Sequence, residues 1–301
     1  MLMPVPRSLP DVAFEAADLA RPLDWVGMAG IALPLSLAGG VQVPASVDVS
    51  VDLGDADKRG IHMSRLYLHL QQQLPSARLD AAGLQALLRD LVESQAGIAT
   101  RARLVLRFEQ LLDRPALVSG NRGWKGYPVE LVLEGDAEHM RAELKVDVAY
   151  SSTCPASAAL SRELNAEAFL AAFGEGQVDA LQVRDWLASK SGMAATPHAQ
   201  RSIASVRVVL ADGFDALPVE ALVDVLEAGL GTPVQTAVKR EDEQAFARAN
   251  AENLMFCEDA ARRVGATLAS LGWIREWSAR IAHLESLHAH DAVASVSGRN
   301  G

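Results

Sequence analysis

Hydrophobic and polar residues alternate along several short stretches of the chain. In residues 46–53, apolar side chains fall on one side of an extended strand and polar ones on the other; the apolar set is Val47, Val49, Val51 and Leu53. A period of two predicts a sheet with one face on a core and the other in water. The same reading predicts strands at residues 103–108, 129–134, 143–150, 202–210, 274–283 and 291–296.

A second pattern, with apolar residues three and four apart, predicts helices between these strands. Residues 79–93 carry an apolar stripe, and Asp80 is placed to cap the first turn. Residues 218–230 and 243–271 show the same periodicity, and residues 160–197 read as a helical excursion.

Both halves of the chain therefore combine antiparallel strands with helices on one face, which is an α+β arrangement. We place the boundary near residue 155, giving units at residues 1–155 and 156–301, the second with a helical insertion at about 160–197. Within the first unit, the glycine-containing residues 121–126 predict a turn between two strands.

Composition narrows the classes of function. The 301 residues carry a formal net charge of −10, so binding to nucleic acid is not expected. The two cysteines, Cys154 and Cys257, are too few for a disulfide framework and are typical of a reduced, cytoplasmic protein. The apolar run at residues 26–37 is too short, and too broken by glycine and proline, to cross a membrane.

Cys154 follows a predicted strand in a polar turn, Tyr-Ser-Ser-Thr-Cys-Pro. A free cysteine is more often a small buried hydrophobe than a reactive group. A polar turn at a strand end nevertheless suits a thiolate that binds a metal or acts as a nucleophile. Cys257 lies inside a helical pattern and is expected in the core.

A second polar cluster precedes the strand at residues 202–210. It combines an imidazole, an amide, a guanidinium and a hydroxyl, on His198, Gln200, Arg201 and Ser202. Loop residues carried by a stable scaffold are favoured places for binding and catalysis. A solvated polar loop is the alternative interpretation of this cluster.

Charged residues gather at Lys239, Arg240 and Glu243, and again at Glu258. Such runs are usually the solvated face of a helix. On one straight helix, Glu243 and Glu258 would lie roughly 22 Å apart, too far to share one small site. Either the chain bends between them or they act in different roles or subunits.

Histidines and basic residues add two further groups. If the segment after residue 283 is extended, His288 and His290 point to the same side of it. Together with cysteine and glutamate, histidine is a usual ligand of zinc and its neighbours. Three side chains follow the first predicted strand: Arg59, His62 and Arg65. They are candidates for contacts with phosphate. The alternative is that they belong to a basic surface loop.

Six segments, in this order, resemble the GTP cyclohydrolase type IB family, the tunnelling-fold enzymes of prokaryotic folate synthesis. They are Asp48-Val-Ser-Val-Asp52 with Arg59-Gly-Ile-His62-Met-Ser-Arg65; Ser152-Thr-Cys154-Pro; His198-Ala-Gln200-Arg201-Ser202; Lys239-Arg240 with Asp242-Glu243; Glu252-Asn253 with Phe256-Cys-Glu258-Asp259; and Glu285-Ser-Leu-His288-Ala-His290. The resemblance covers nearly the whole chain. Many relatives carry a second cysteine two positions after the first, where this chain has Ala156.

The resemblance implies tandem tunnelling-fold units that assemble as a homotetramer, with sites near subunit interfaces. It implies metal-dependent hydrolysis of GTP to 7,8-dihydroneopterin triphosphate and formate. A divalent metal lowers the pKa of bound water, and histidine suits proton transfer near neutral pH. The mixed ligand set fits zinc, manganese or iron, and the sequence does not choose among them.

Roles follow from position in the motifs. The metal ligands that the resemblance implies are Cys154, Glu243 and one of His288 and His290. His198 corresponds either to a further ligand or to the group that transfers protons. Glu258 corresponds to the carboxylate that anchors the guanine edge. Further substrate contacts are expected from Arg59, His62, Arg65, Gln200, Arg201, Ser202, Lys239 and Arg240.

Two other functions stay open at this point. A different tunnelling-fold enzyme, of deazapurine or pterin metabolism, would use Cys154 as a covalent nucleophile and would need no metal. A non-catalytic relative would hold a purine or pterin without turning it over. An assay with GTP and added metal separates these readings.

Overall fold

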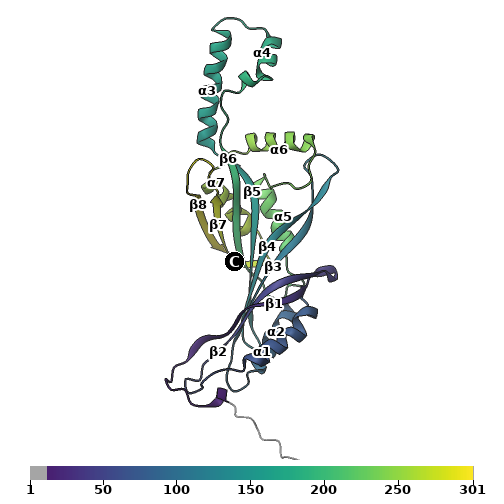
Figure 1. Cartoon of the computed structure of the whole chain (residues 1–301), viewed down its shortest axis with the longest axis vertical. Helices are drawn as coiled ribbons and strands as arrows, with labels where there is room; N and C mark the ends of the chain where they lie inside the picture. Colours follow the sequence, from purple (N-terminus) through teal and green to yellow (C-terminus); the bar gives the residue numbers. More distant parts are fainter. Residues whose placement is uncertain (1–11, 301) are drawn as a thin grey trace, which may run out of the picture. The chain divides into compact units, whose positions relative to one another are not determined.

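The protein is described by a computed structural model in which residues 12–300 are placed. Its strands form an eight-stranded sheet whose spatial order follows the chain from the first strand to the last (Figure 1). The first three strands pair in antiparallel fashion, as do the last two. The strands are β1 (Leu23–Ser36), β2 (Gln42–Leu53), β3 (Ala102–Pro115), β4 (Arg122–Gly135), β5 (Met140–Thr153), β6 (Ala199–Leu210), β7 (Ile274–His283) and β8 (Ala292–Arg299).

Helices connect these strands and make the fold α+β, as the alternating patterns predict. They are α1 (Met63–Gln73), α2 (Ala81–Glu93), α3 (Pro155–Phe173), α4 (Ala180–Leu187), α5 (Val219–Leu230), α6 (Arg240–Glu252) and α7 (Cys257–Ala269). Among residues 12–300, no helix is long and apolar enough to span a membrane.

The chain forms two compact units that are not contiguous in sequence. The first comprises residues 1–110, 128–145 and 209–218, and the second comprises residues 111–127, 146–208 and 219–301. The predicted boundary at residue 155, between tunnelling-fold units at residues 1–155 and 156–301, stays a prediction.

The first unit confirms the two patterns from which it was predicted. Every second residue of β2, from Val47 to Leu53, is buried, and the leucine stripe of α2 is buried with it. Asp80 caps α2 as expected, because its Oδ1 accepts a hydrogen bond of 2.7 Å from the backbone N–H of Gly83.

The second unit carries the helical excursion that was predicted between its strands. The excursion begins at Pro155 and contains α3 and α4, which Figure 1 shows beyond the ends of β5 and β6. Rings of Phe169, Phe173 and Trp186 pack together with centroids 5.1–5.9 Å apart, so a half-buried aromatic cluster links α3 to α4. Helix α7 packs on β7 and β8 and also contacts α5.

The prediction of one helix over residues 243–271 is wrong. The chain leaves the helix at Asn253, and α7 begins after Phe256. The Asp259 carboxylate accepts a hydrogen bond of 3.0 Å from the Phe256 N–H, which caps the new helix. Of the two alternatives that the Glu243–Glu258 spacing left open, a break in the helix between the two residues is therefore present.

One predicted turn is wrong, and two elements were missed. Gly123 and Gly126 lie inside β4 rather than in a turn, and Gly123 leaves room for the side chain of Thr236 packed against it. The apolar run at 26–37 belongs to β1, an element missed because glycine and proline interrupt its alternation. Helix α1 was also missed, since its polar residues hide a short apolar stripe of Leu66 and Leu70.

Candidate functional site

Three strand ends meet in the second unit. The backbone N–H of Cys154 donates to the carbonyl of His198 at 3.3 Å, so the end of β5 lies beside the start of β6. On the other side of β6, the Leu284 N–H donates to the Arg201 carbonyl at 3.1 Å, which places the end of β7 there. Neighbouring strands that run in opposite directions thus bring polar residues 44 or more positions apart in sequence to one edge.

Cys154 occupies the junction between β5 and α3. It is the N-cap of α3, and its Sγ accepts a long hydrogen bond of 3.5 Å from the Ser157 N–H. The residue is free and half-buried, unlike Cys257, which is buried as predicted. Cys154 thus stands at the N-terminal end of α3, next to the start of β6.

His198 is held from several sides. Its backbone N–H donates to Ser157 Oγ at 3.1 Å, and its Nδ1 lies 3.0 Å from Gln200 Oε1. The same Nδ1 lies 3.9 Å from Oε2 of Glu285, whose side chain is 12% exposed. Among the residues that the structure describes, this Glu285 oxygen is buried and accepts no hydrogen bond. His198 therefore stands next to a carboxylate with spare acceptor capacity.

Behind His198 lies a row of buried polar side chains. Gln200 Nε2 donates to Ser152 Oγ at 3.0 Å, and Ser152 Oγ lies 2.7 Å from Ser202 Oγ. Further along, the Tyr150 hydroxyl lies 2.8 Å from His283 Nε2. Burial raises the pKa of Tyr150 well above its usual range, so its hydroxyl stays protonated. Sequence reasoning missed Tyr150 and His283, because both sit in alternating strand patterns.

A cavity of about 430 Å³ opens beside this row. Its lining residues are Tyr150, Ser151, Ala199, Gln200, Arg201, Val234, Gln235, Val238, Asp242, Glu243 and Phe246. This volume lies within the usual range for small-molecule sites. It combines an apolar wall from Val234, Val238 and Phe246 with a cation at Arg201 and a carboxylate at Glu243. The structure therefore brings Gln200, Arg201 and Glu243 to one cavity.

Asp242 holds the start of α6 at the cavity. The side chain is fully buried and accepts hydrogen bonds of 2.7–2.8 Å from Val118 N–H, Ser119 N–H, Ser119 Oγ–H and Lys239 N–H. These donors, with the Lys239 and Ser119 groups foremost, hold the pKa of Asp242 far below its usual range. Asp242 is thus an anchor for its neighbour Glu243 rather than a reacting group.

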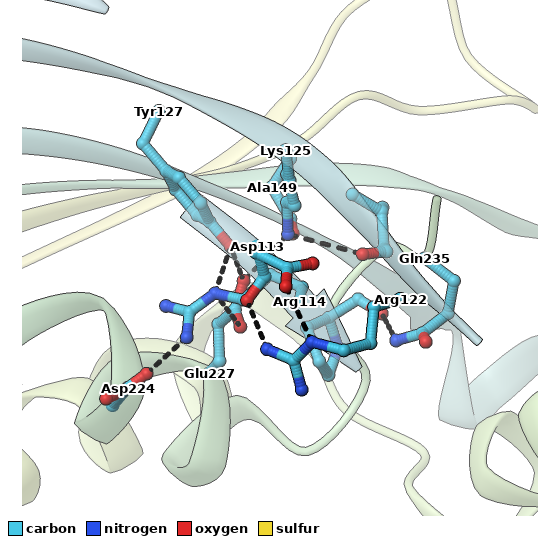
Figure 2. A network of polar contacts seen from close by, with 11 residues as sticks. Asp113, Arg114, Arg122, Lys125, Tyr127, Ala149, Asp224, Glu227 and Gln235 are labelled. Carbon is cyan, nitrogen blue, oxygen red and sulfur yellow. Dashed lines mark hydrogen bonds and ion pairs between the residues drawn. The ribbon is translucent and has the colours of Figure 1, made fainter. Parts of the chain in front are cut away.

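Figure 2 shows a network of polar contacts. Through the Val234 carbonyl, this network supports the apolar wall of the cavity. Lys125, on β4, donates to Glu227 Oε1 at 2.7 Å and to the carbonyls of Val234 and Ala149 at 3.3 and 3.5 Å. The Tyr127 hydroxyl donates to the same Glu227 oxygen at 2.6 Å. Burial lowers the pKa of Lys125, and the Glu227 carboxylate opposes that shift. The buried pair fixes residue 234, which lines the cavity.

Glu258 lies in the first turn of α7 and is exposed. The pKa of its carboxyl group is lowered, first by its own backbone N–H and then by the Cys257 thiol. The thiol sulfur lies 3.2 Å from Glu258 Oε2. The carboxylate also acts electrostatically on His283, so it lies near the row of buried side chains. An ionised, exposed carboxylate is free to accept hydrogen bonds from a ligand.

Other predicted residues do not join this cluster. Arg59, His62 and Arg65 belong to the first unit. There Arg59 pairs with Glu15 at 3.0 Å, and Arg65 donates to the Ser94 carbonyl at 3.2 Å.

In the second unit, Lys239 and Arg240 are exposed at the start of α6. His288 and His290 are exposed in the loop between β7 and β8, with rings stacked 5.2 Å apart; the extended arrangement considered for them is wrong.

The predicted metal ligands can be tested against this geometry. Cys154 and His198 are neighbours, and sulfur and imidazole donors suit zinc and related metals. Within residues 12–300, however, no three His, Cys, Asp or Glu side chains are close enough together to hold a metal ion. Cys154, Glu243 and His288 or His290 are therefore not brought together within one chain.

Comparison with known proteins gives the same family as the motifs. The sequence profile described as "Type I GTP cyclohydrolase folE2" matches residues 9–294. The chain is 50% identical to "GTP cyclohydrolase FolE2" of Pseudomonas putida over 287 residues, which cover 95% of each chain. It is also 50% identical to the protein of that name from Chromohalobacter salexigens over 289 residues, covering 96% of this chain and 94% of that one.

The similarity to solved structures gives information about the fold only. A highly active mutant of Bacillus sp. TB-90 urate oxidase aligns with a TM-score of 0.53 at 8% identity, covering 92% of this chain and all of that one. A uricase from Bacillus fastidious aligns with a TM-score of 0.50 at 8% identity, covering 91% and 93%. These likenesses support the tunnelling fold. With half of all positions shared along nearly the whole chain, this protein belongs to the type I GTP cyclohydrolase FolE2 family.

Proposed function

We propose that this protein hydrolyses GTP to 7,8-dihydroneopterin triphosphate and formate, as the first step of folate synthesis in the cytoplasm. The observation that carries the proposal is the convergence of three family motifs at one edge of the sheet. Cys154, His198 and Gln200 meet there beside a cavity that also holds Arg201 and Glu243. Family membership supplies the reaction class, since the named relatives are GTP cyclohydrolases.

Substrate recognition follows from the charges at this edge. GTP presents a purine with an N–H edge and a polyanionic triphosphate. Glu258 is the residue we assign to the N–H edge, because an ionised carboxylate accepts two hydrogen bonds side by side. Arg201 is the cavity's cation, and it suits a phosphate oxygen. Lys239 and Arg240, exposed at the start of α6, extend the positive charge.

Proton transfer falls to His198 in this proposal. Ring opening adds water at C8 of the purine and releases formate, so protons must leave the attacking water and reach the departing nitrogen. Imidazole does this near neutral pH. His198 is half-buried and anchored at Nδ1, which leaves Nε2 as its other proton site. We assign Cys154, its neighbour, to the same reacting centre.

Metal dependence and the homotetramer remain proposals that accompany this function. The ligands missing from one chain would come from rearranged loops or from another copy. Metal analysis of protein purified without chelators tests the first, and light scattering on the purified protein tests the second. We expect about one zinc, manganese or iron per chain, and a mass of four chains.

The function is tested by incubating the purified protein with GTP and added zinc, manganese or iron. We expect stoichiometric formate, together with a pterin that fluoresces after oxidation. Absence of turnover with every metal would refute the proposal. A covalent adduct on Cys154 without formate would instead indicate the nucleophilic, metal-free chemistry of another tunnelling-fold enzyme.

Cys154→Ala tests the role of Cys154 at the reacting centre. We expect this variant to lose metal binding and turnover while keeping its assembly, because the thiol makes only one weak hydrogen bond in the fold. Cys257→Ser is the control: it removes the other thiol but keeps a donor to Glu258, so it should keep both metal binding and turnover. Turnover by Cys154→Ala near that of the parent would overturn the role given to this residue.

A further inference from the structure

A single ammonium group joins three elements of the second unit beside the cavity. Lys125 Nζ, carried by β4, lies 2.7 Å from Glu227 Oε1 on α5 (Figure 2). The same nitrogen lies 3.3 Å from the Val234 carbonyl and 3.5 Å from the Ala149 carbonyl on β5. An ammonium group has three N–H donors and no acceptor, so it has one donor for each element. Lys125 therefore fixes three elements from one point.

The Val234 carbonyl belongs to residues 231–239, which connect α5 to α6 without regular helix or strand. Below we call these residues the connector. It contributes three residues to the lining of the cavity: Val234, Gln235 and Val238. On β5, Ser151 N–H donates to the Thr232 carbonyl at 2.8 Å, and Val234 N–H donates to the Ala149 carbonyl at 3.3 Å. A segment without its own ladder keeps its place through such bonds to neighbours.

The ammonium group has little freedom to leave this position. Lys125 is 7% exposed, and its Nζ lies 4.9 Å from the centroid of the Tyr127 ring. The Tyr127 hydroxyl donates to Glu227 Oε1 at 2.6 Å, which holds the carboxylate in place opposite the cation. A buried cation away from its partner is costly, so the pair keeps one arrangement. The contact with Val234 is thereby kept as well.

We propose that Lys125 is a positioning residue for substrate binding, which holds the connector so that Val234 and Val238 form a wall for the purine ring of GTP. This inference rests on the proposed function. An apolar wall suits the flat face of a purine. A wall that is already in place avoids the free energy needed to order a loop when the ligand binds. Lys125 lies outside the six family motifs.

Lys125→Met is the first test, because methionine keeps a side chain of similar length without the three donors. We expect KM for GTP to rise about tenfold while kcat stays within about twofold, since the wall contacts the purine equally in the bound substrate and in the transition state. Steady-state kinetics with GTP and the metal that supports turnover measure both constants. A KM near that of the parent would overturn the proposal.

A double variant, Lys125→Met with Glu227→Gln, separates positioning from stability. Lys125→Met alone leaves the buried Glu227 carboxylate without its cation, so the thermal midpoint should fall. The neutral amide of Glu227→Gln still accepts from Tyr127, so the double variant should recover most of the thermal midpoint. Its KM should stay raised, because the Val234 carbonyl still lacks the ammonium donor. Recovery of KM together with the thermal midpoint would assign the effect to stability and contradict the proposal.

Asp224→Asn is the matched control within the same network. It weakens the ion pair of 2.6 Å between Asp224 and Arg114 and leaves the contacts of the connector in place (Figure 2). We expect KM and kcat to remain those of the parent. A KM raised as much as in Lys125→Met would mean that any loss of charge in the network has this effect, and the specific role of Lys125 would be wrong.

Hydrogen exchange of the ligand-free, full-length protein tests the positioning without reference to GTP. In peptides that cover the connector, Lys125→Met and the double variant should exchange about tenfold faster than the parent, because the segment opens more often. Peptides from α2, in the first unit, serve as the internal reference and should not change. Unchanged exchange of the connector in Lys125→Met overturns the proposal. A parent that does not turn over GTP refutes the proposed function, while the exchange rates still decide the role of Lys125.

Discussion

Two buried polar clusters satisfy their hydrogen bonds in different ways. In the first unit, Asp52 is 6% exposed and accepts at both oxygens: from Thr100 N–H and Arg101 N–H at 2.7 Å, and from Thr100 Oγ1–H at 2.8 Å. In the second unit, a row of buried or half-buried side chains consists of groups that can both donate and accept. We call this row the relay; its members are His198, Gln200, Ser152, Ser202, Tyr150 and His283. The Asp52 cluster therefore has one fixed direction, whereas the relay has two.

In the function proposed above, this difference separates a cluster that stabilises the fold from one that takes part in proton transfer. Burial alone would raise the pKa of Asp52, but hydrogen bonds from Arg101 and Thr100 outweigh it and lower the pKa. That carboxylate stays charged and fully paired, so it fixes residues 100–101 at the start of β3. The relay ends at His198 beside an oxygen of Glu285 with spare capacity. Proton transfer requires groups whose hydrogen bonds can change direction, next to an acceptor that does not already accept a hydrogen bond.

We expect the largest effect on turnover from substitution of His198, the member of the relay next to Glu285. His198→Gln retains a polar side chain but cannot exchange protons, so kcat for GTP should fall by about 10²–10⁴-fold. The thermal midpoint should change little, because the side chain is at the edge of the cluster. Steady-state kinetics and a melting curve on the same preparation check both parts. A variant with kcat near that of the parent would remove His198 from the reaction.

Asp52→Ala should have its effect on stability instead. It leaves two backbone N–H groups and one hydroxyl without their acceptor, a loss of about 3 kcal/mol. We expect a lower thermal midpoint and unchanged kcat per folded molecule, measured by calorimetry and by active-site titration. A fall in kcat without a fall in stability would break the proposed distinction between the two clusters.

Single hydroxyls offer a finer comparison. Thr100→Val deletes one hydrogen bond to Asp52 and should lower stability by about 1 kcal/mol with no change in kcat. Ser152→Ala deletes the central hydroxyl of the relay and should lower kcat about tenfold. Both variants are measured by denaturant titration and by GTP turnover. Equal kinetic effects in the two would contradict the relay.

The smallest effect is a pH dependence of stability. The folded-state pKa of Asp52 is lowered from the ordinary value of 3.8. Its contribution is therefore fully present above pH 3.8 and is lost as the pH falls through the folded-state value. The difference in thermal midpoint between the parent and Asp52→Asn should shrink below pH 3.8. A difference that stays constant into acid would assign the stabilisation to something other than the charge.

The sequence by itself determined the elements with regular periodicity. The alternation of β2, the leucine stripe of α2 and the cap at Asp80 are local patterns, because burial of one face dictates which residues are apolar. Motif order also determined the family and the main candidates at the cavity. It failed at β1 and α1, where the alternation is interrupted or the stripe is short, and at the break after Asn253, where capping ends a pattern that periodicity alone continues.

Only the tertiary structure decided which candidates meet. The antiparallel ends of β5, β6 and β7 bring Cys154, His198 and Glu285 together, and no local spacing encodes that proximity. Tyr150 and His283 became part of the site for the same reason, since each is an ordinary inward-facing strand residue in sequence. His288 and His290, adjacent to the motif, instead lie exposed in a loop. Hydrogen-bond direction is a property of neighbours in space, and therefore of the folded chain.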